Sequence, residues 1–254
     1  MTFAFLISLF AGLSTAVGGL IPLFAKKTNT AFLCFSLGLS AGVMVYISFM
    51  ELLPEAIGSL SAVYGQRTGY LMSLGFFLLG MAVIALIDKL VPEDENPHEF
   101  GHESSGNLKK MGLMSALAIG VHNFPEGLAS FMSALADPVS GISIAVAIAL
   151  HNIPEGMTVS SPVYHSTGSR GRAFMMSLAS GLAEPVGALV GFLFLRSVFT
   201  PFTFALVYAL VAGIMVYLAF DELLPTAENY GRHHLVIYAV IIGIVLMGLT
   251  LALM

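Results

Sequence analysis

Apolar residues dominate eight stretches of the chain, and charged, glycine or proline residues separate one stretch from the next. Each stretch holds about 20 residues, the length that an α-helix needs to cross the hydrocarbon core of a membrane. The pattern predicts eight transmembrane helices at about 3–24, 32–54, 70–90, 111–133, 139–160, 173–195, 202–224 and 234–253. We therefore expect an all-α membrane protein whose 254 residues form a single transmembrane domain, 1–254.

The composition supports a membrane protein and excludes several other classes. Hydrophobic residues make up 57% of the chain and charged residues only 10%, whereas soluble domains carry about 25% charged residues. So few charges cannot cover a water-facing surface, which excludes a soluble fold. The ten Lys and Arg residues are scattered and form no basic patch, which excludes nucleic-acid binding. The single cysteine, Cys34, excludes an internal disulfide and a metal site made of several cysteines.

The basic residues also predict the orientation of the chain, because cytoplasmic loops of membrane proteins are enriched in Lys and Arg. Arg67 and Arg196 flank the loops of one side, and eight basic residues flank the loops of the other: Lys26, Lys27, Lys89, Lys109, Lys110, Arg170, Arg172 and Arg232. This distribution predicts a multi-pass plasma-membrane protein with both termini outside the cytoplasm. In a bacterium the membrane would be the inner one.

The longest predicted loop, about 91–110, is polar throughout and has the composition of a disordered linker. It contains histidines and glutamates that could collect metal ions loosely: Glu95, His98, Glu99, His102 and Glu103. We favour a solvated cytoplasmic connector over a metal site for this loop.

Three internal repeats are present. Residues 41–54 match 212–225 at ten of fourteen positions, and 11–20 match 180–189 at five of ten. Since five helices separate the partners of each match, the matched helices must run in opposite directions, as in the inverted repeats of many transporters. Residues 116–127 match 145–156 at eight of twelve positions, on consecutive and hence antiparallel helices. The repeats predict eight transmembrane helices in a 3+2+3 arrangement.

The third repeat carries the polar residues best suited to metal binding. His122, Asn123 and Glu126 in HNFPEG are matched by the equivalent residues of HNIPEG, which are His151, Asn152 and Glu155. The spacing of four residues puts His and Glu on one helix face. Imidazole nitrogen, amide oxygen and carboxylate oxygen suit zinc, iron, manganese and similar divalent ions.

The prolines of the two motifs, and the depth of the polar residues along their predicted helices, support the same site. Pro125 and Pro154 each remove a backbone donor and free the carbonyl four residues earlier, which predicts helix breaks beside the motifs. The two motifs and Glu184 fall about half way along their predicted helices. Three buried carboxylates, Glu126, Glu155 and Glu184, would therefore meet at the membrane midplane, where divalent cations would neutralise them. The alternative is that these groups serve helix packing alone, for which interhelical hydrogen bonds give little stabilisation.

Further acids occur in the long repeat. Glu51 and Glu222 occupy equivalent positions, and the predicted topology puts Glu51 toward the outside and Glu222 toward the cytoplasm. We expect them, with Asp221, to line the entry and exit of a cation pathway; the alternative is that acids at helix ends simply meet interfacial water. Met44, Met50 and Met215 are interpreted as packing residues and not as soft metal ligands.

The paired motifs HNFPEG and HNIPEG, with AEP at 183–185 on the next helix, resemble the ZIP family of divalent metal transporters. The resemblance covers essentially the whole chain and implies uptake of Zn²⁺, with Fe²⁺, Mn²⁺, Co²⁺ and Cd²⁺ as further candidate ions, as transported substrates and not as a prosthetic group. It also implies a two-metal site. One position would use His122, Glu126, His151 and Glu155, and the other Asn123, Glu126, Asn152, Glu155 and Glu184.

The expected mechanism is a carrier in which the inverted three-helix repeats surround or rock against the motif helices, with metal release helped by protonation of the ligands. A selective channel and, less favoured, an intramembrane metalloenzyme are the alternatives. No Ser or Lys residue stands out as a nucleophile, which argues against an enzyme. The expected partners are the metal ions and the lipid bilayer, and a homodimer is one option for the assembly.

Overall fold

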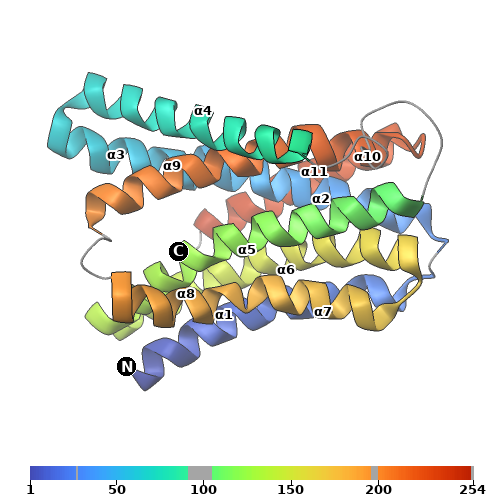
Figure 1. The fold of residues 1–254 in the computed structure, drawn as a ribbon, viewed down its shortest axis with the longest axis horizontal. Coiled ribbons are helices and arrows are strands. Elements are labelled where there is room, and N and C mark those ends of the chain that lie inside the picture. The colour runs from blue at the N-terminus through green and yellow to red at the C-terminus, as the bar shows by residue number, and fades with distance from the viewer. Residues whose placement is uncertain (27, 91–104, 196–199, 253–254) are drawn as a thin grey trace.

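The computed structural model describes residues 1–26, 28–90, 105–195 and 200–252. This part of the chain is helical and contains no strand, which confirms the predicted all-α class. The helices lie parallel or antiparallel to one long direction, as a bundle that crosses a membrane requires (Figure 1). The five histidines and glutamates of the predicted metal-collecting loop lie outside the described residues.

The first half of the chain contains α1 (Thr2–Leu20), the 3-10 turn η1 (Ile21–Phe24), α2 (Thr30–Ile47), the π-helical segment η2 (Ser48–Leu52), α3 (Leu53–Tyr64), α4 (Gln66–Leu90) and α5 (Ser105–Ala136). The second half contains α6 (Pro138–Thr167), α7 (Arg170–Gly181), α8 (Ala183–Val190), the π-helical segments η4 (Gly191–Leu195) and η5 (Leu218–Leu223), α9 (Pro201–Tyr217), α10 (Leu224–Glu228) and α11 (His233–Ala252).

The predicted membrane spans correspond to these elements, with some merging of neighbours. Six helical stretches of the described residues are long and apolar enough to span a membrane. The other two long helices, α5 and α6, have 32 and 30 residues and contain the HNFPEG and HNIPEG motifs. Their length exceeds the roughly 20 residues that a span requires.

Two helices continue beyond the predicted span ends, where proline was taken as a terminator. The predicted helix 32–54 continues to Tyr64, and the predicted helix 202–224 continues to Glu228. In both places a π-helical segment precedes the proline, and Pro54 and Pro225 then stand in the first turn of α3 and α10. The π-helical segments thus carry the chain past these prolines within one continuous helix.

The prolines of the two motifs also leave their helices uninterrupted. Pro125 lies inside α5, and Pro154 lies inside α6. The predicted breaks at these positions are therefore absent, and the helices are continuous through the motifs. Neighbouring helices re-satisfy the backbone around such prolines in membrane proteins.

The helices form two packed groups, each of which combines helices that are distant in the sequence. In one group α1, α5, α6, α7 and α8 pack on one another; in the other α2 packs on α11, and α3, α4 and α9 pack together. The two groups are the lower and upper halves of Figure 1, and they meet mainly where α2 contacts α6. The matched repeats α1 and α7–α8 run in opposite directions, as their sequence match predicts (Figure 1).

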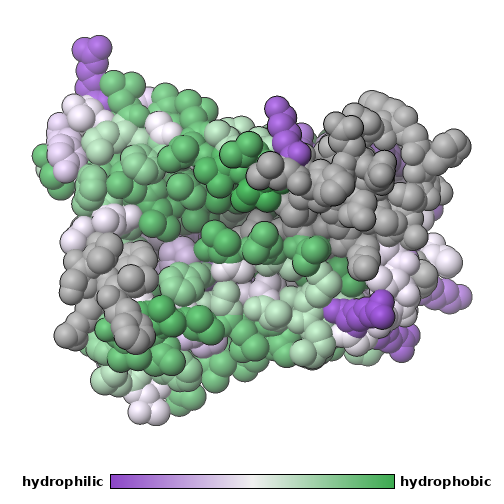
Figure 2. Space-filling model, in the orientation of Figure 1, coloured by the Kyte–Doolittle hydropathy of each residue, from purple (hydrophilic) through white to green (hydrophobic). Residues whose placement is uncertain are grey.

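The visible outer surface is mainly hydrophobic along the bundle, and hydrophilic residues gather toward its ends (Figure 2). Leu71 and Leu78 of α4 and Leu249 of α11 are more than half exposed, as lipid-facing residues are. Inside, Met44 and Met215 are 1% and 2% exposed and belong to the main apolar core. Their interpretation as packing residues is confirmed. Met50, in contrast, is 58% exposed.

Candidate metal site

Two histidines and two glutamates meet where α5 and α6 pack along each other. His122 and Glu126 come from α5, and His151 and Glu155 come from the equivalent positions of α6. Glu126 Oε1 lies 3.1 Å from His122 Nε2 and 3.3 Å from His151 Nε2. Glu155 Oε1 lies 3.6 Å from His122 Nε2. Each carboxylate therefore approaches imidazole rings across the helix pair, as the mirrored spacing predicts.

The dimensions of this cluster and its unpartnered polar atoms fit a divalent cation. One ligand atom from each of His122, His151 and Glu155 lies within 4.8 Å of the other two. The Nδ1 atoms of both histidines and both oxygens of Glu155 are buried without a hydrogen-bond partner. Buried polar atoms normally have partners, so these four indicate a ligand. Within the described residues, this is the one cluster of three or more such side chains at metal-binding distances.

The two asparagines are oriented by backbone carbonyls of helices that pack beside the motif pair. Asn152 Nδ2 donates to the carbonyl oxygen of Ala11 at 3.0 Å, and Asn123 Nδ2 donates to that of Ser180 at 3.4 Å. The Oδ1 atoms of both asparagines are buried and have no partner. Because the amide donors are held by α1 and α7, the amide oxygens remain available as metal ligands.

Glu184 completes the predicted set from a third element. It stands in the first turn of α8, just after the irregular junction at Leu182, and is 0% exposed. Its Oε1 accepts a hydrogen bond from Asn152 Nδ2, while its Oε2 is buried without a partner. The structure thus brings Glu184 against the α6 motif, as the midplane depth predicts.

Close backbone contacts at the motif glycines fix these helices relative to one another. A Cβ atom at Gly127 would overlap with the carbonyl oxygen of Glu184, and one at Gly156 would overlap with that of Thr15. Any residue but glycine would push α5 away from α8 or α6 away from α1. The motif glycines therefore hold the neighbouring helices, and with them Glu184, in place.

The sequence did not identify Ala11 and Ser180, whose carbonyls orient the two asparagines. A backbone acceptor has no residue-type signature. One signal was nevertheless available: these residues are the first positions of the matched segments 11–20 and 180–189. The same match relates the two hydrogen bonds to each other.

The predicted pathway acids occupy the π-helical segments of the long repeat. Glu51 lies in η2, and Asp221 and Glu222 lie in η5. The Glu51 carboxyl is close enough to His151, Glu126 and His122 to interact with them electrostatically, and its Oε2 is buried without a hydrogen-bond partner. Glu51 is therefore deeper than the predicted helix end at 54 implied, because the helix continues to Tyr64.

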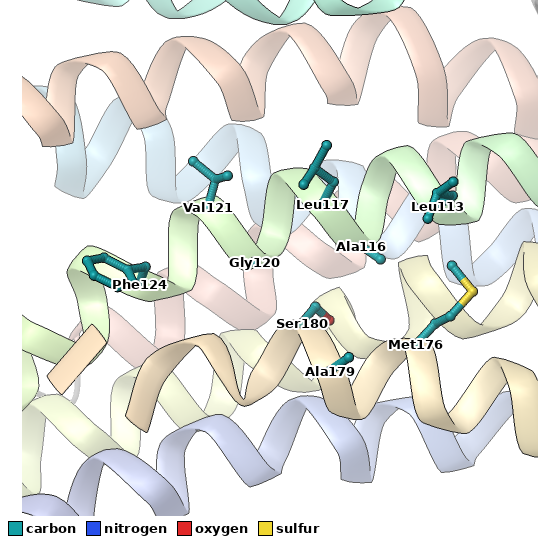
Figure 3. A pocket seen from close by; sticks show the side chains of 9 residues that line it. All are labelled: Leu113, Ala116, Leu117, Gly120, Val121, Phe124, Met176, Ala179 and Ser180. Atoms are coloured by element: carbon teal, nitrogen blue, oxygen red, sulfur yellow. The ribbon is translucent and has the colours of Figure 1, made fainter. Parts of the chain in front are cut away.

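A cavity of about 570 Å³ lies between α5 and α7 (Figure 3). Leu113, Leu117, Val121 and Phe124 of α5 face it, with Met176 and Ser180 of α7 opposite. At 100° per residue these α5 positions lie on the face opposite His122 and Glu126. The lining is apolar and offers no charged ligand, so this cavity is not a cation site.

Comparison with known proteins supports the same chemistry. The family model described as "ZIP Zinc transporter" matches residues 92–251. A protein of Chlorobaculum parvum named "Zinc transporter ZupT" is 54% identical over 260 residues, which cover 99% of this chain and 97% of the relative. Proteins of the same name from Chlorobium chlorochromatii and Clostridium perfringens are 55% and 48% identical, covering 99% and 98% of this chain and 97% and 95% of those relatives.

Proposed function

The chain belongs to the ZIP family of zinc transporters, and we propose that it carries Zn²⁺ into the cytoplasm through the cluster between α5, α6 and α8. The observation that carries this proposal is the buried group of His122, His151 and Glu155, whose ligand atoms lie within 4.8 Å of one another. On this proposal, the protein is a membrane carrier of divalent metal ions. Buried ionisable groups of this kind are retained in membrane helices for function.

The donor atoms support two adjacent metal positions. The first would use His122, Glu126, His151 and Glu155. The second would use the asparagine oxygens with the carboxylates, as Asn123, Glu126, Asn152, Glu155 and Glu184. Glu126 and Glu155 would bridge the two ions. The oxygen-rich second position suits Fe²⁺, Mn²⁺ and Co²⁺ beside Zn²⁺ and Cd²⁺.

The packing suggests how the site would be exposed to each side in turn. All proposed ligands lie in the group formed by α1 and α5–α8. Close backbone contacts at glycine occur inside each group, at Gly156 against Thr15 and at Gly213 against Phe77. Between the groups, Ser40 Oγ donates to the carbonyl oxygen of Pro154 at 2.7 Å. We propose that the ligand-bearing group moves as a body against the other, in place of the rocking three-helix repeats expected from the sequence.

Reconstitution of the purified protein into liposomes tests the function. We expect uptake of radioactive zinc that saturates at micromolar concentration and that excess Cd²⁺, Co²⁺, Fe²⁺ or Mn²⁺ reduces. Protein-free liposomes are the control. Uptake no faster than in the control would contradict transport. Uptake that rises linearly with concentration would instead support a channel, and hydrolysis of a substrate without metal movement would support an enzyme.

A polar face along η2 and α3 supports an outer approach to this site. Glu51, Glu55 and Ser59 follow one another at intervals of four residues, so they share a helix face with Gly58. Ser59 Oγ donates to Glu55 Oε1 at 3.3 Å, and a Cβ atom at Gly58 would meet nothing within 4 Å. An exposed carboxylate along a membrane-spanning helix requires a watery cavity beside it.

Tyr208 of α9 connects this face to the midplane. Its side chain is close enough to Glu126, Glu51 and Glu55 to interact with all three electrostatically. We propose that a hydrated cation enters from outside along Glu55 and Glu51 and then reaches His151. Glu222 and Asp221, in the equivalent segment of the inverted repeat, would serve the cytoplasmic exit.

A cysteine placed at Gly58 should detect the outer approach. In intact spheroplasts, a charged, membrane-impermeant thiol reagent is expected to label Gly58→Cys and to reduce its zinc uptake at least about fivefold. The native Cys34 is buried and should not react. Leu71→Cys is the matched control, because Leu71 is 55% exposed on the apolar surface of α4 at a similar distance from the α3–α4 turn. Equal labelling of both variants, or of neither, would contradict this route.

A further inference from the structure

Thr15 is a buried threonine of α1 whose hydroxyl has no partner in the protein. The residue is 0% exposed, and Oγ1 has no hydrogen-bond partner. A threonine inside a helix normally bonds to the carbonyl four residues earlier. Here that carbonyl, of Ala11, already accepts from Asn152 Nδ2 at 3.0 Å and from Ser14 Oγ at 2.6 Å. The Thr15 hydroxyl is therefore left for another ligand.

A local two-fold relation defines where this hydroxyl lies. It exchanges α1 with α7–α8 at an offset of 169 residues and α5 with α6 at an offset of 29 residues. A Cβ atom at Gly18 would overlap with the carbonyl of Ile153, and one at the equivalent Gly187 would overlap with that of Phe124. The asparagine bonds to Ala11 and Ser180 obey the same offsets. Under this relation the residue equivalent to Thr15 is Glu184.

The immediate packing of Thr15 and Glu184 is also equivalent. A Cβ atom at Gly181 would lie 2.8 Å from Thr15 Cβ and 3.1 Å from its Oγ1. A Cβ atom at Gly12, the equivalent of Gly181, would lie 3.3 Å from Glu184 Cβ. Both side chains therefore project from their helices next to the point where α1 and α7 cross.

The two side chains differ in length, and this difference leaves polar atoms unpartnered on the α1 side. Glu184 reaches Asn152 and accepts a hydrogen bond from its amide nitrogen. The equivalent partner of Thr15 is Asn123, which the shorter threonine does not reach. Thr15 Oγ1 and Asn123 Oδ1 are both buried without a hydrogen-bond partner. These two unpartnered oxygens are therefore available as ligands for a cation on this side.

We propose that the Thr15 hydroxyl is a neutral oxygen ligand of the cation in the second metal position, on the side opposite Glu184. This inference rests on the proposed two-position site. A hydroxyl offers a lone pair without adding a fourth negative charge to Glu126, Glu155 and Glu184. It therefore completes the coordination of a divalent cation while leaving the binding weak enough for release.

Zinc binding to the purified transporter, measured by calorimetry, tests this role. Thr15→Val keeps the branched shape and removes the hydroxyl, and we expect it to weaken one of the two zinc sites about tenfold while the other is unchanged. Thr15→Ser keeps the hydroxyl and should bind like the wild type. Thr250→Val is the matched control, since the Thr250 hydroxyl bonds to the carbonyl of Leu246 at 2.9 Å in α11.

The melting temperature separates a ligand from a packing residue. Removal of a buried hydroxyl without a partner should leave the metal-free protein at least as stable as the wild type. Wild-type affinity at both sites in Thr15→Val would overturn the proposal, and so would equal loss in Thr15→Ser, which shares the hydroxyl. A wild type that transports zinc but binds one ion would overturn the two-position site and this inference. A wild type that moves no metal would overturn the proposed function itself.

Discussion

Replacement of Glu126 by alanine is expected to lower zinc uptake into proteoliposomes by about 100-fold or more, to the level of protein-free liposomes. The reason is geometric. Glu126 Oε1 lies 3.1 Å from His122 Nε2 and 3.3 Å from His151 Nε2, so it is the carboxylate between the two imidazoles. Removal of residues that merely orient metal ligands already costs about 10- to 100-fold in affinity or activity. The loss of a bridging ligand should cost at least as much.

The control for this variant is Glu228→Ala, the same chemical change outside the site. Glu228 is 37% exposed at the side chain and pairs with His233 at 2.8 Å near the end of α10. Its replacement should leave uptake within about twofold of the wild type, since exposed ion pairs contribute little. Both variants must elute as single species of wild-type size. Wild-type uptake by Glu126→Ala would exclude the motif cluster as the transport site.

Replacement of Gly156 by alanine should have the largest effect on stability. The added methyl group would overlap with the backbone carbonyl of Thr15, which cannot rotate away as a side chain can. Overpacking of this kind costs about 1–3 kcal/mol or more. At the upper end, the melting temperature of a chain of this size would fall by about 6–12 °C. Thermal unfolding of the detergent-solubilised protein, followed by its elution profile, measures this change.

Gly75→Ala is the matched substitution for this experiment. Gly75 lies inside α4, and a Cβ atom there would meet nothing within 4 Å. Alanine should leave the melting temperature unchanged or raise it slightly, because glycine is about 1 kcal/mol less favourable in a helix interior. If both variants melted at the same temperature, α1 and α6 would have to tolerate separation, and the close packing at Gly156 would not hold the site together.

The ligands themselves could be read from the sequence because their signal is local. A spacing of four residues puts His122 and Glu126 on one helix face, and the repeat places His151 and Glu155 in the same way. Depth along the helix located Glu184 at the same level. None of these inferences required knowledge of how distant helices pack.

The packing could not be read in this way. The positions that bring α1 against α6 are glycines and small residues, such as Gly18 and Gly156, which do not stand out in a chain with 26 glycines. The continuation of the helix beyond Pro54 depends on the π-helical segment before it, which hydropathy does not report. The grouping of α2 with α11 depends on such contacts and not on order along the chain.

The inverted repeats have an energetic consequence at two positions where an acid has an uncharged counterpart. A perfectly mirrored pathway would bind an ion equally well when open to either side of the membrane. Glu184 is paired with Thr15, and Asp221 is paired with Met50, so each carboxylate has an uncharged counterpart. Under the proposed carrier mechanism, the outward-open and inward-open states would therefore hold the ion with different affinities. Loading and unloading would then be unequal steps.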